Sequence, residues 1–367
     1  MIQENQRLLS IDVIRGMTIA FMIIVNTPGS WEFVYAPLRH AEWDGLTPTD
    51  LVFPFFLFIV GLSMAQSFKS HQNFTKSQLF TKALKRTLVI FGVGLLLNWF
   101  PFYEKPLSEL RIFGVLQRIA LAYFAGACIS IYVKEKYQLW TTMVILVGYY
   151  LILIGSVVVG PLTLESNVVR TIDLALLGEN HMYHGYKGIP FDPEGLLSTL
   201  GSIGNVMFGY ILARKIANLE NRMKKIQYVF SFGAILITIG IIWNFTGFPI
   251  NKPIWSSSYA MLSSGLAAWL FAAMIYVIDE KGYTRWAFPF KVFGMNALAS
   301  YALSGLVIRT LNLIKSGEDG LPALFYKNVL SPMAGPYFGS FLSALLFCFL
   351  IWLLALALYK NKIFIKA

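Results

Sequence analysis

The chain has few charged residues for its length: only 13% of its 367 residues are Asp, Glu, Lys or Arg. A soluble globular domain carries about 25%, so the composition argues against a soluble enzyme or binding domain. Hydrophobic residues make up 56% of the chain, and the mean hydropathy is +0.61. These values predict a protein that crosses a membrane several times.

Cysteine and histidine are also scarce. Cys128 and Cys348 both lie inside apolar runs, so neither a disulfide framework nor a thiolate metal site is expected. Among the four histidines, His181 and His184 are spaced like a metal-binding pair, but no third ligand follows at a suitable spacing. We therefore predict no metal site. The polar N-terminus and the lack of a small-residue cleavage site also argue against a signal peptide.

Long apolar runs are abundant instead. A run of about 17 to 25 mostly apolar residues can cross a bilayer. About ten such runs occur, near residues 10–28, 48–68, 86–102, 113–133, 138–159, 195–213, 227–246, 255–278, 290–314 and 337–359. The ninth is interrupted by Gly294 and Asn296. The sequence thus predicts an all-α polytopic membrane bundle of about ten transmembrane helices, forming a single domain over residues 1–367.

The net charge of +11 reflects topology rather than nucleic-acid binding. If the N-terminus lies in the cytoplasm, 18 Lys and Arg residues fall in cytoplasmic loops and 8 in outer loops. Such an excess follows the positive-inside rule. We predict that both termini are cytoplasmic and that no nucleic acid is bound.

The segment 39–56 carries His40 and three carboxylates directly before an apolar run. Ionisable groups close to hydrocarbon are costly and tend to be functional. In the predicted topology His40 lies outside, and an imidazole can take up and return a proton near neutral pH. His40 is therefore the leading candidate for a general base, with an ordinary loop histidine as the alternative.

The carboxylates of the outer loops also have structural explanations. Thr47 to Asp50 is typical of a helix start, with Pro48 in the first turn and Asp50 reaching back like a capping box. Asp192-Pro-Glu194 is expected to open the run at 195 in the same way. For Asp50, Asp192 and Glu194, both a functional role and a capping role remain open. Pro54 follows Asp50 by four residues and should free the Asp50 carbonyl as an acceptor.

Two further groups of residues suit ligand binding. The outer loop 160–194 has aromatic, amide and carboxylate side chains of the kind that bind sugars. Basic residues at the cytoplasmic helix ends could bind a phosphorylated donor, although the positive-inside rule also accounts for them. They include Lys82, Arg86, Arg214 and Lys215.

Taken in order over about 300 residues, several segments resemble the transmembrane acyltransferases of the heparan-α-glucosaminide N-acetyltransferase type. They are residues 7–16 with Asn26, then 40–54, 114–118, 176–183, 192–195, 251–259 and 294–296. That family's lumenal N-terminal domain is not found before the Ser-Ile-Asp motif. A bacterial homologue in the cytoplasmic (inner) membrane is therefore expected, rather than a lysosomal protein.

The resemblance implies that cytosolic acetyl-CoA donates an acetyl group to the amine of a glucosamine-type sugar outside. His40 would be the general base, with Asn26 and Asp50 orienting it or stabilising the oxyanion. The implied sugar contacts are Trp43, His181, Asp192, Glu194 and Asn296. The implied acetyl-CoA contacts are Lys82, Arg86, Gln117, Arg118, Arg214 and Lys215.

The family also suggests a homodimer, and it leaves a rival function open. An amino-sugar permease would use a polar path through the same helices without acetyl transfer. Such a transporter should depend on Asp12, Arg118 and Asn296 but tolerate the loss of CoA binding.

Overall fold

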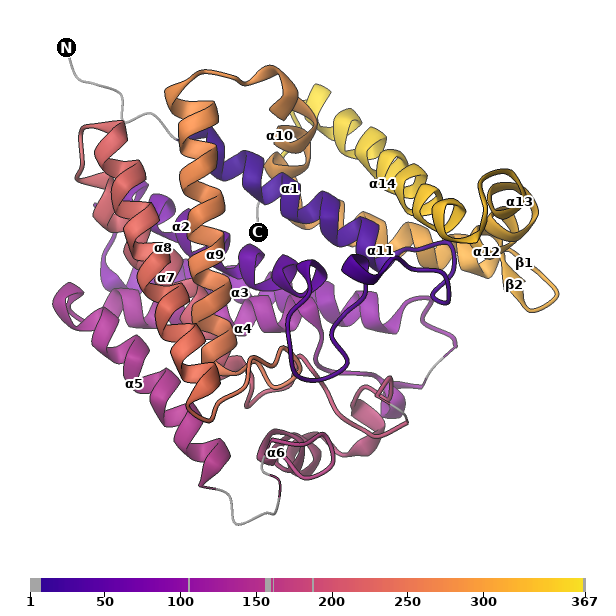
Figure 1. The fold of residues 1–367 in the computed structure, drawn as a ribbon, viewed down its shortest axis with the longest axis horizontal. Coiled ribbons are helices and arrows are strands. Elements are labelled where there is room, and N and C mark those ends of the chain that lie inside the picture. Colours follow the sequence, from indigo (N-terminus) through magenta and orange to yellow (C-terminus); the bar gives the residue numbers. More distant parts are fainter. Residues whose placement is uncertain (1–7, 105, 156–159, 161, 187, 366–367) are drawn as a thin grey trace.

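The computed structural model describes residues 8–104, 106–155, 160, 162–186 and 188–365. Helices dominate this part of the chain (Figure 1), as the composition predicts. Seven spans of the described residues are long and apolar enough to cross a membrane. They are Leu9–Asn26 (α1), Pro48–Ser70 (η2 and α2), Val115–Tyr132 (α4), Glu135–Ile154 (α5), Arg222–Phe245 (α8), Ser257–Glu280 (α9 and η5) and Pro336–Lys360 (α14).

An eighth candidate span is bent. It joins Arg285–Met295 (η6 and α10) to Ala297–Leu313 (α11), with an angle of 76° between the two parts. Asn296 occupies the break, which confirms the predicted interruption of the ninth run. Its Nδ2 donates to the Ile363 carbonyl and its Oδ1 accepts from the Ile365 N–H, both at 2.9 Å. The break is thereby tied to the C-terminal segment.

Two more long helices match predicted runs but are less apolar: α3 (Lys76–Trp99) and α7 (Thr199–Ala217). Helix α7 packs against α2, α4, α5 and α9. Its buried Ser202 and Asn205 therefore face protein rather than lipid. Apolar character alone supports seven or eight spans among the described residues, fewer than the ten predicted.

Two boundaries differ from the prediction for local reasons. Helix α3 begins at Lys76 rather than at residue 86, because Thr75 and Gln78 form a capping box. The loop 160–194 contains an amphipathic helix, Val168–Leu177 (α6), which is too short to show as an apolar run. The smaller elements are η1 (Ala36–Leu38), η3 (Leu107–Glu109), η4 (Glu179–His181), β1 (Lys315–Ser316), β2 (Asp319–Gly320), α12 (Leu321–Phe325), η7 (Tyr326–Leu330) and α13 (Ser331–Ala334).

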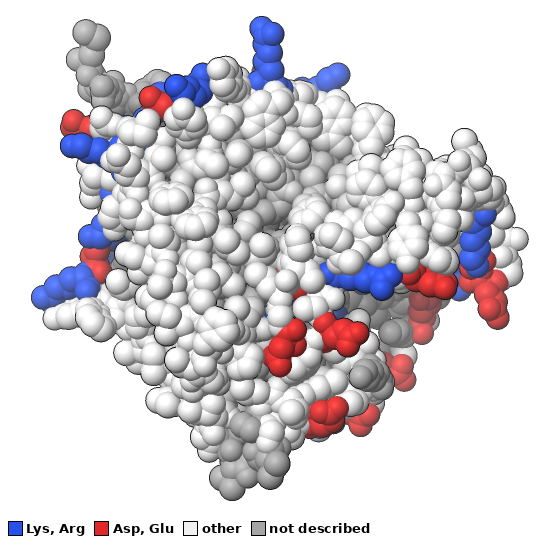
Figure 2. All heavy atoms as spheres, in the orientation of Figure 1, with Lys and Arg blue, Asp and Glu red and all other residues white. Residues whose placement is uncertain are grey.

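Four connecting segments meet at one end of the bundle, and we call their described residues the loop cap: 27–51, 100–104 with 106–114, 162–186 with 188–198, and 246–256. They gather around α6 in the lower part of Figure 1. On the face shown in Figure 2, most Lys and Arg side chains lie along the upper and left edges, away from that end. Most Asp and Glu side chains lie toward the lower right. The two ends of the bundle therefore differ in charge.

Glycines allow a close helix crossing between α2 and α7. A Cβ atom on Gly61 would lie 1.9 Å from the Val206 carbonyl oxygen, and one on Gly209 would lie 2.0 Å from the Phe58 carbonyl oxygen. Small residues let helix backbones approach in this way. We expect Gly61→Ala to destabilise the protein by about 1–3 kcal/mol or more through overpacking, measured as thermal unfolding in detergent. Gly148→Ala is the matched control, since nothing lies within 4 Å of a Cβ there.

Candidate functional site

His40 and Asp50 lie together in the loop cap. His40 Nδ1 is 2.7 Å from Asp50 Oδ1, and the His40 side chain is 45% exposed while that of Asp50 is 1% exposed. Asp50 Oδ2 accepts from the backbone N–H groups of Ala41 at 3.1 Å and of Thr47 at 3.0 Å. A carboxylate held in this way fixes the imidazole and favours the tautomer with its proton on Nδ1. The exposed Nε2 then carries the lone pair.

The backbone around Asp50 confirms two sequence predictions. Asp50 reaches back to Thr47 at the start of η2, as the capping box requires. Pro54 has no N–H to donate to the Asp50 carbonyl, which accepts from the Tyr259 hydroxyl at 2.5 Å instead. Asp50 is therefore both a cap and the partner of His40.

Lys252 is the third charged residue of this group, and the sequence did not single it out. Its Nζ lies 3.3 Å from Asp50 Oδ1, 2.9 Å from His40 Nδ1 and 3.4 Å from His40 Nε2. Because Nδ1 donates to Asp50, the ammonium binds the carboxylate rather than the ring. Burial lowers the pKa of Lys252, and the Asp50 charge opposes that shift.

The same contacts fix the position of the His40 loop. Asp44 Oδ1 accepts from Asn251 Nδ2 at 3.0 Å, next to Lys252 in the chain. Trp43 donates to the Leu162 carbonyl at 2.9 Å and its ring packs 5.5 Å from that of Phe191. Trp43, a predicted sugar contact, thus joins the His40 loop to the loop around α6.

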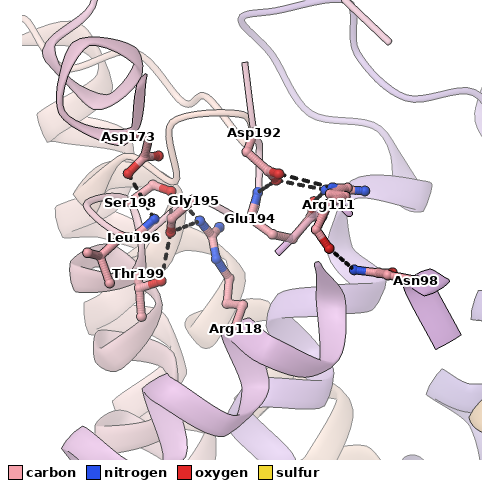
Figure 3. A network of polar contacts seen from close by, with 10 residues as sticks. All are labelled: Asn98, Arg111, Arg118, Asp173, Asp192, Glu194, Gly195, Leu196, Ser198 and Thr199. Atoms are coloured by element: carbon pink, nitrogen blue, oxygen red, sulfur yellow. Dashed lines mark hydrogen bonds and ion pairs between the residues drawn. The ribbon is translucent and has the colours of Figure 1, made fainter. Parts of the chain in front are cut away.

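Arg111 neutralises the two carboxylates that were expected to open the span at 195 (Figure 3). It forms a two-point ion pair with Asp192, at 3.0 and 2.7 Å, and contacts Glu194 at 2.6 Å. Burial alone would lower the pKa of Arg111, but the two carboxylates outweigh it and raise that pKa. The capping prediction for Asp192 and Glu194 is wrong, because α7 begins only at Thr199.

Asp173 of α6 provides the cap instead. Its Oδ1 accepts from the N–H groups of Leu196 at 3.0 Å and Leu197 at 3.3 Å (Figure 3). Asp173 is fully buried, and its Oδ2 has no hydrogen-bond partner among the described residues. Burial raises its pKa from 3.8 to about 6.

This shift predicts a pH-dependent stability. The folded protein binds the Asp173 proton more tightly than the unfolded chain, so stability falls as pH rises from about 4 through 6. The change attributable to this group is about 3 kcal/mol. Asp173→Asn keeps an acceptor for the two N–H groups and should flatten the profile. The measurement is the free energy of unfolding in detergent between about pH 4 and pH 7. If stability depended on pH in Asp173→Asn as it does in the wild type, Asp173 would not be the group responsible.

Arg118 lies deeper in the bundle, fully buried. Its Nη2 contacts the Ser198 hydroxyl and donates to the Gly195 carbonyl at 3.1 Å (Figure 3). The guanidinium also lies over the Trp255 ring, 4.8 Å from the ring centroid. Its Nε and Nη1, and Nε2 of the neighbouring Gln117, have no hydrogen-bond partner among the described residues. Three buried donors close to the loop cap are thus left for an acceptor.

The remaining candidates are more scattered. Asn26 is exposed at the end of α1, with no described hydrogen bond to His40 or Asp50. His181 contacts the Leu110 carbonyl at 2.7 Å. Asn296 holds the C-terminal segment and is not part of the loop cap.

The basic residues that were predicted to face the cytoplasm do not form one cluster. Lys82 lies 2.6 Å from His71 Nε2, and Arg86 lies over the Tyr123 ring at 4.5 Å. Arg214 pairs with Glu135 at 2.8 Å, and Lys215 is exposed.

Three residues of this site were not assigned from sequence. Lys252 and Arg111 were counted only as outer-loop cations, although Lys252 lies inside the segment 251–259 that carries the family resemblance. No sequence pattern singled out Asp173, because its helix, α6, was not predicted.

Known proteins are similar to this chain in sequence. The family profile described as heparan-alpha-glucosaminide N-acetyltransferase, catalytic, matches residues 7–178. The human heparan-alpha-glucosaminide N-acetyltransferase is 29% identical over 351 residues, and the mouse protein of that name is 28% identical. Each alignment covers 80% of this chain, which spans about half the length of these relatives. The chain is therefore similar to the heparan-α-glucosaminide N-acetyltransferases over most of its length.

Proposed function

We propose that the protein transfers the acetyl group of acetyl-CoA to the amine of a glucosamine-type sugar. The observation that carries this proposal is the His40–Asp50 pair, with a fixed, half-exposed imidazole whose Nε2 carries the lone pair of the favoured tautomer. The names of both relatives support it, and no observation favours the permease alternative.

The proposed reaction needs one base and one positive charge. The amine nitrogen forms a bond to the thioester carbonyl carbon while His40 Nε2 takes a proton from the amine. The carbon–sulfur bond then breaks, and the imidazolium returns the proton to the leaving thiolate. Lys252 is placed beside the ring to stabilise the negative carbonyl oxygen. Asn26 is the proposed second donor.

The donor would approach from the opposite end of the bundle. Gln117 and Arg118 offer unpartnered buried donors on that path, and Lys82, Arg86, Arg214 and Lys215 would attract phosphate at the basic end. The sugar would bind beside Trp43 and His181, with Asp192 and Glu194 ordering the loops around it. We further propose ten spans in a bacterial inner membrane with both termini cytoplasmic. The charge difference between the two ends supports the cytoplasmic placement of the basic end.

The direct test is purified protein in detergent, supplied with acetyl-CoA and glucosamine. Mass spectrometry should find N-acetylglucosamine together with free CoA. Sugar uptake into proteoliposomes with no acetylated product would overturn the proposal.

Lys252 is expected to matter for the rate rather than for binding. Lys252→Gln should lower kcat by about 10²–10³-fold, the effect of losing one oxyanion donor, with little change in KM for acetyl-CoA. Lys252→Arg keeps the charge and should recover part of the rate. The exposed Lys327, paired with Asp319, is the control position. An equal loss of kcat in both Lys252 variants would instead indicate a purely structural role.

A further inference from the structure

A polar cavity lies at the edge of the loop cap and has no part in the proposed reaction. It has a volume of about 350 Å³ and opens between the C-terminal ends of α3 and α11. Its polar lining residues are Asn98, Trp99, Glu104, Arg309, Asn312 and Lys315. Small-molecule pockets begin at about 300 Å³, so the cavity has room for one sugar-sized ligand.

The cavity has an excess of positive charge. Arg309 and Lys315 both line it, against the single carboxylate of Glu104. Among the described residues no carboxylate forms an ion pair with either cation, and the nearby Asp319 binds Lys327 instead. Arg309 lines the cavity with a partly exposed side chain. Its Nη1 has no hydrogen-bond partner among the described residues but is wholly buried, so the rest of the guanidinium would meet a ligand. An anion in the cavity would offset the cost of burying this charge.

The other lining groups suit hydroxyls. The amides of Asn98 and Asn312 offer both donors and acceptors, and the exposed Glu104 at the rim accepts. Asn98 already donates to the Arg111 carbonyl at 3.0 Å (Figure 3), which holds it against the loop cap. The Trp99 ring adds an apolar face, with a buried indole N–H that no described residue accepts. This set of groups matches a ligand with one anionic group and several hydroxyls.

We propose that this cavity is a binding site for an anionic polyol, a glycerol- or sugar-sized molecule with a phosphate or carboxylate. Arg309 and Lys315 bind the anion, while Asn98, Asn312 and Glu104 bind hydroxyls. The same chemistry is found in a phospholipid headgroup and in a free acidic sugar or polyol phosphate. The site is independent of acetyl transfer at His40.

Calorimetric titration of the full protein in a neutral detergent tests the site, with glycerol 3-phosphate and glucuronate as probes and glycerol and glucose as neutral controls. At least one anion should bind, and the neutral compounds should not. Arg309→Gln should weaken binding of the anion at least about 10-fold. Arg309→Lys should weaken it less, and the control variant Lys327→Gln should leave it unchanged. If Arg309→Gln does not fold, Lys315→Gln, an exposed position, replaces it.

Adding phosphatidylglycerol distinguishes the two sources. Competition with the soluble anion would identify a lipid headgroup, and continued binding of the soluble anion would identify a free polyol; either result supports the site. No binding of either anion, or equal binding by wild type and Arg309→Gln, would overturn it.

Discussion

Replacing His40 with alanine is expected to lower acetyl transfer by about 10²–10⁴-fold, the usual contribution of a positioned general base. The physical reason is that Asp50 orients the half-exposed imidazole of His40 and leaves the lone pair on Nε2. The measurement is the initial rate of N-acetylglucosamine formation by purified protein. Binding of acetyl-CoA should persist, since the proposed contacts of the donor lie elsewhere.

Asp50→Asn is the companion variant. An amide can leave the backbone cap partly intact, but it no longer favours the tautomer with the proton on Nδ1. Its rate should therefore fall, and its unfolding temperature should fall as well, because Lys252 loses its counter-charge. If His40→Ala retained near-normal turnover, His40 could not be the general base, whatever the effect of Asp50→Asn.

The capping box at Asp50 could be predicted because its parts are local, whereas the pairing of Asp50 with His40 was implied only by the family resemblance. The two residues are ten positions apart, and the capping box at Thr47 already requires Asp50 to turn back toward the loop. The broken ninth span was predictable for the same reason, since Asn296 interrupts an apolar run. Patterns within one turn or one run determine these features before any tertiary contact forms.

Contacts between distant segments could not be predicted in this way. Lys252 lies 212 positions from His40 and Arg111 lies 81 from Asp192, and nothing in the local pattern pairs them. Asp192 shows the consequence: its Asp-Pro-Glu pattern is typical of a helix cap, yet an arginine from another loop takes both carboxylates. Tertiary electrostatics here outweighs the local capping preference.

Loss of Arg111 should have the largest effect on stability. Arg111→Leu leaves the fully buried Asp192 without a counter-charge, and removing one partner of a buried ion pair costs about 3–5 kcal/mol. Arg111 joins the loop before α4 to the loop before α7, so the loop cap should loosen as well. The measurement is the free energy of unfolding in detergent.

Two controls separate this effect from a general loss of charge. Arg111→Leu with Asp192→Asn removes the stranded charge and should recover much of the loss, which identifies coupling within the pair. Arg214→Gln breaks the exposed pair with Glu135, whose side chains are 39% and 49% exposed, and should cost at most about 1 kcal/mol. If Arg111→Leu were as mild as Arg214→Gln, Asp192 would have to reach water or take up a proton in the variant. In that case the destabilisation should reappear as the pH is raised, because burial raises the pKa of Asp192 while Arg111 opposes that shift.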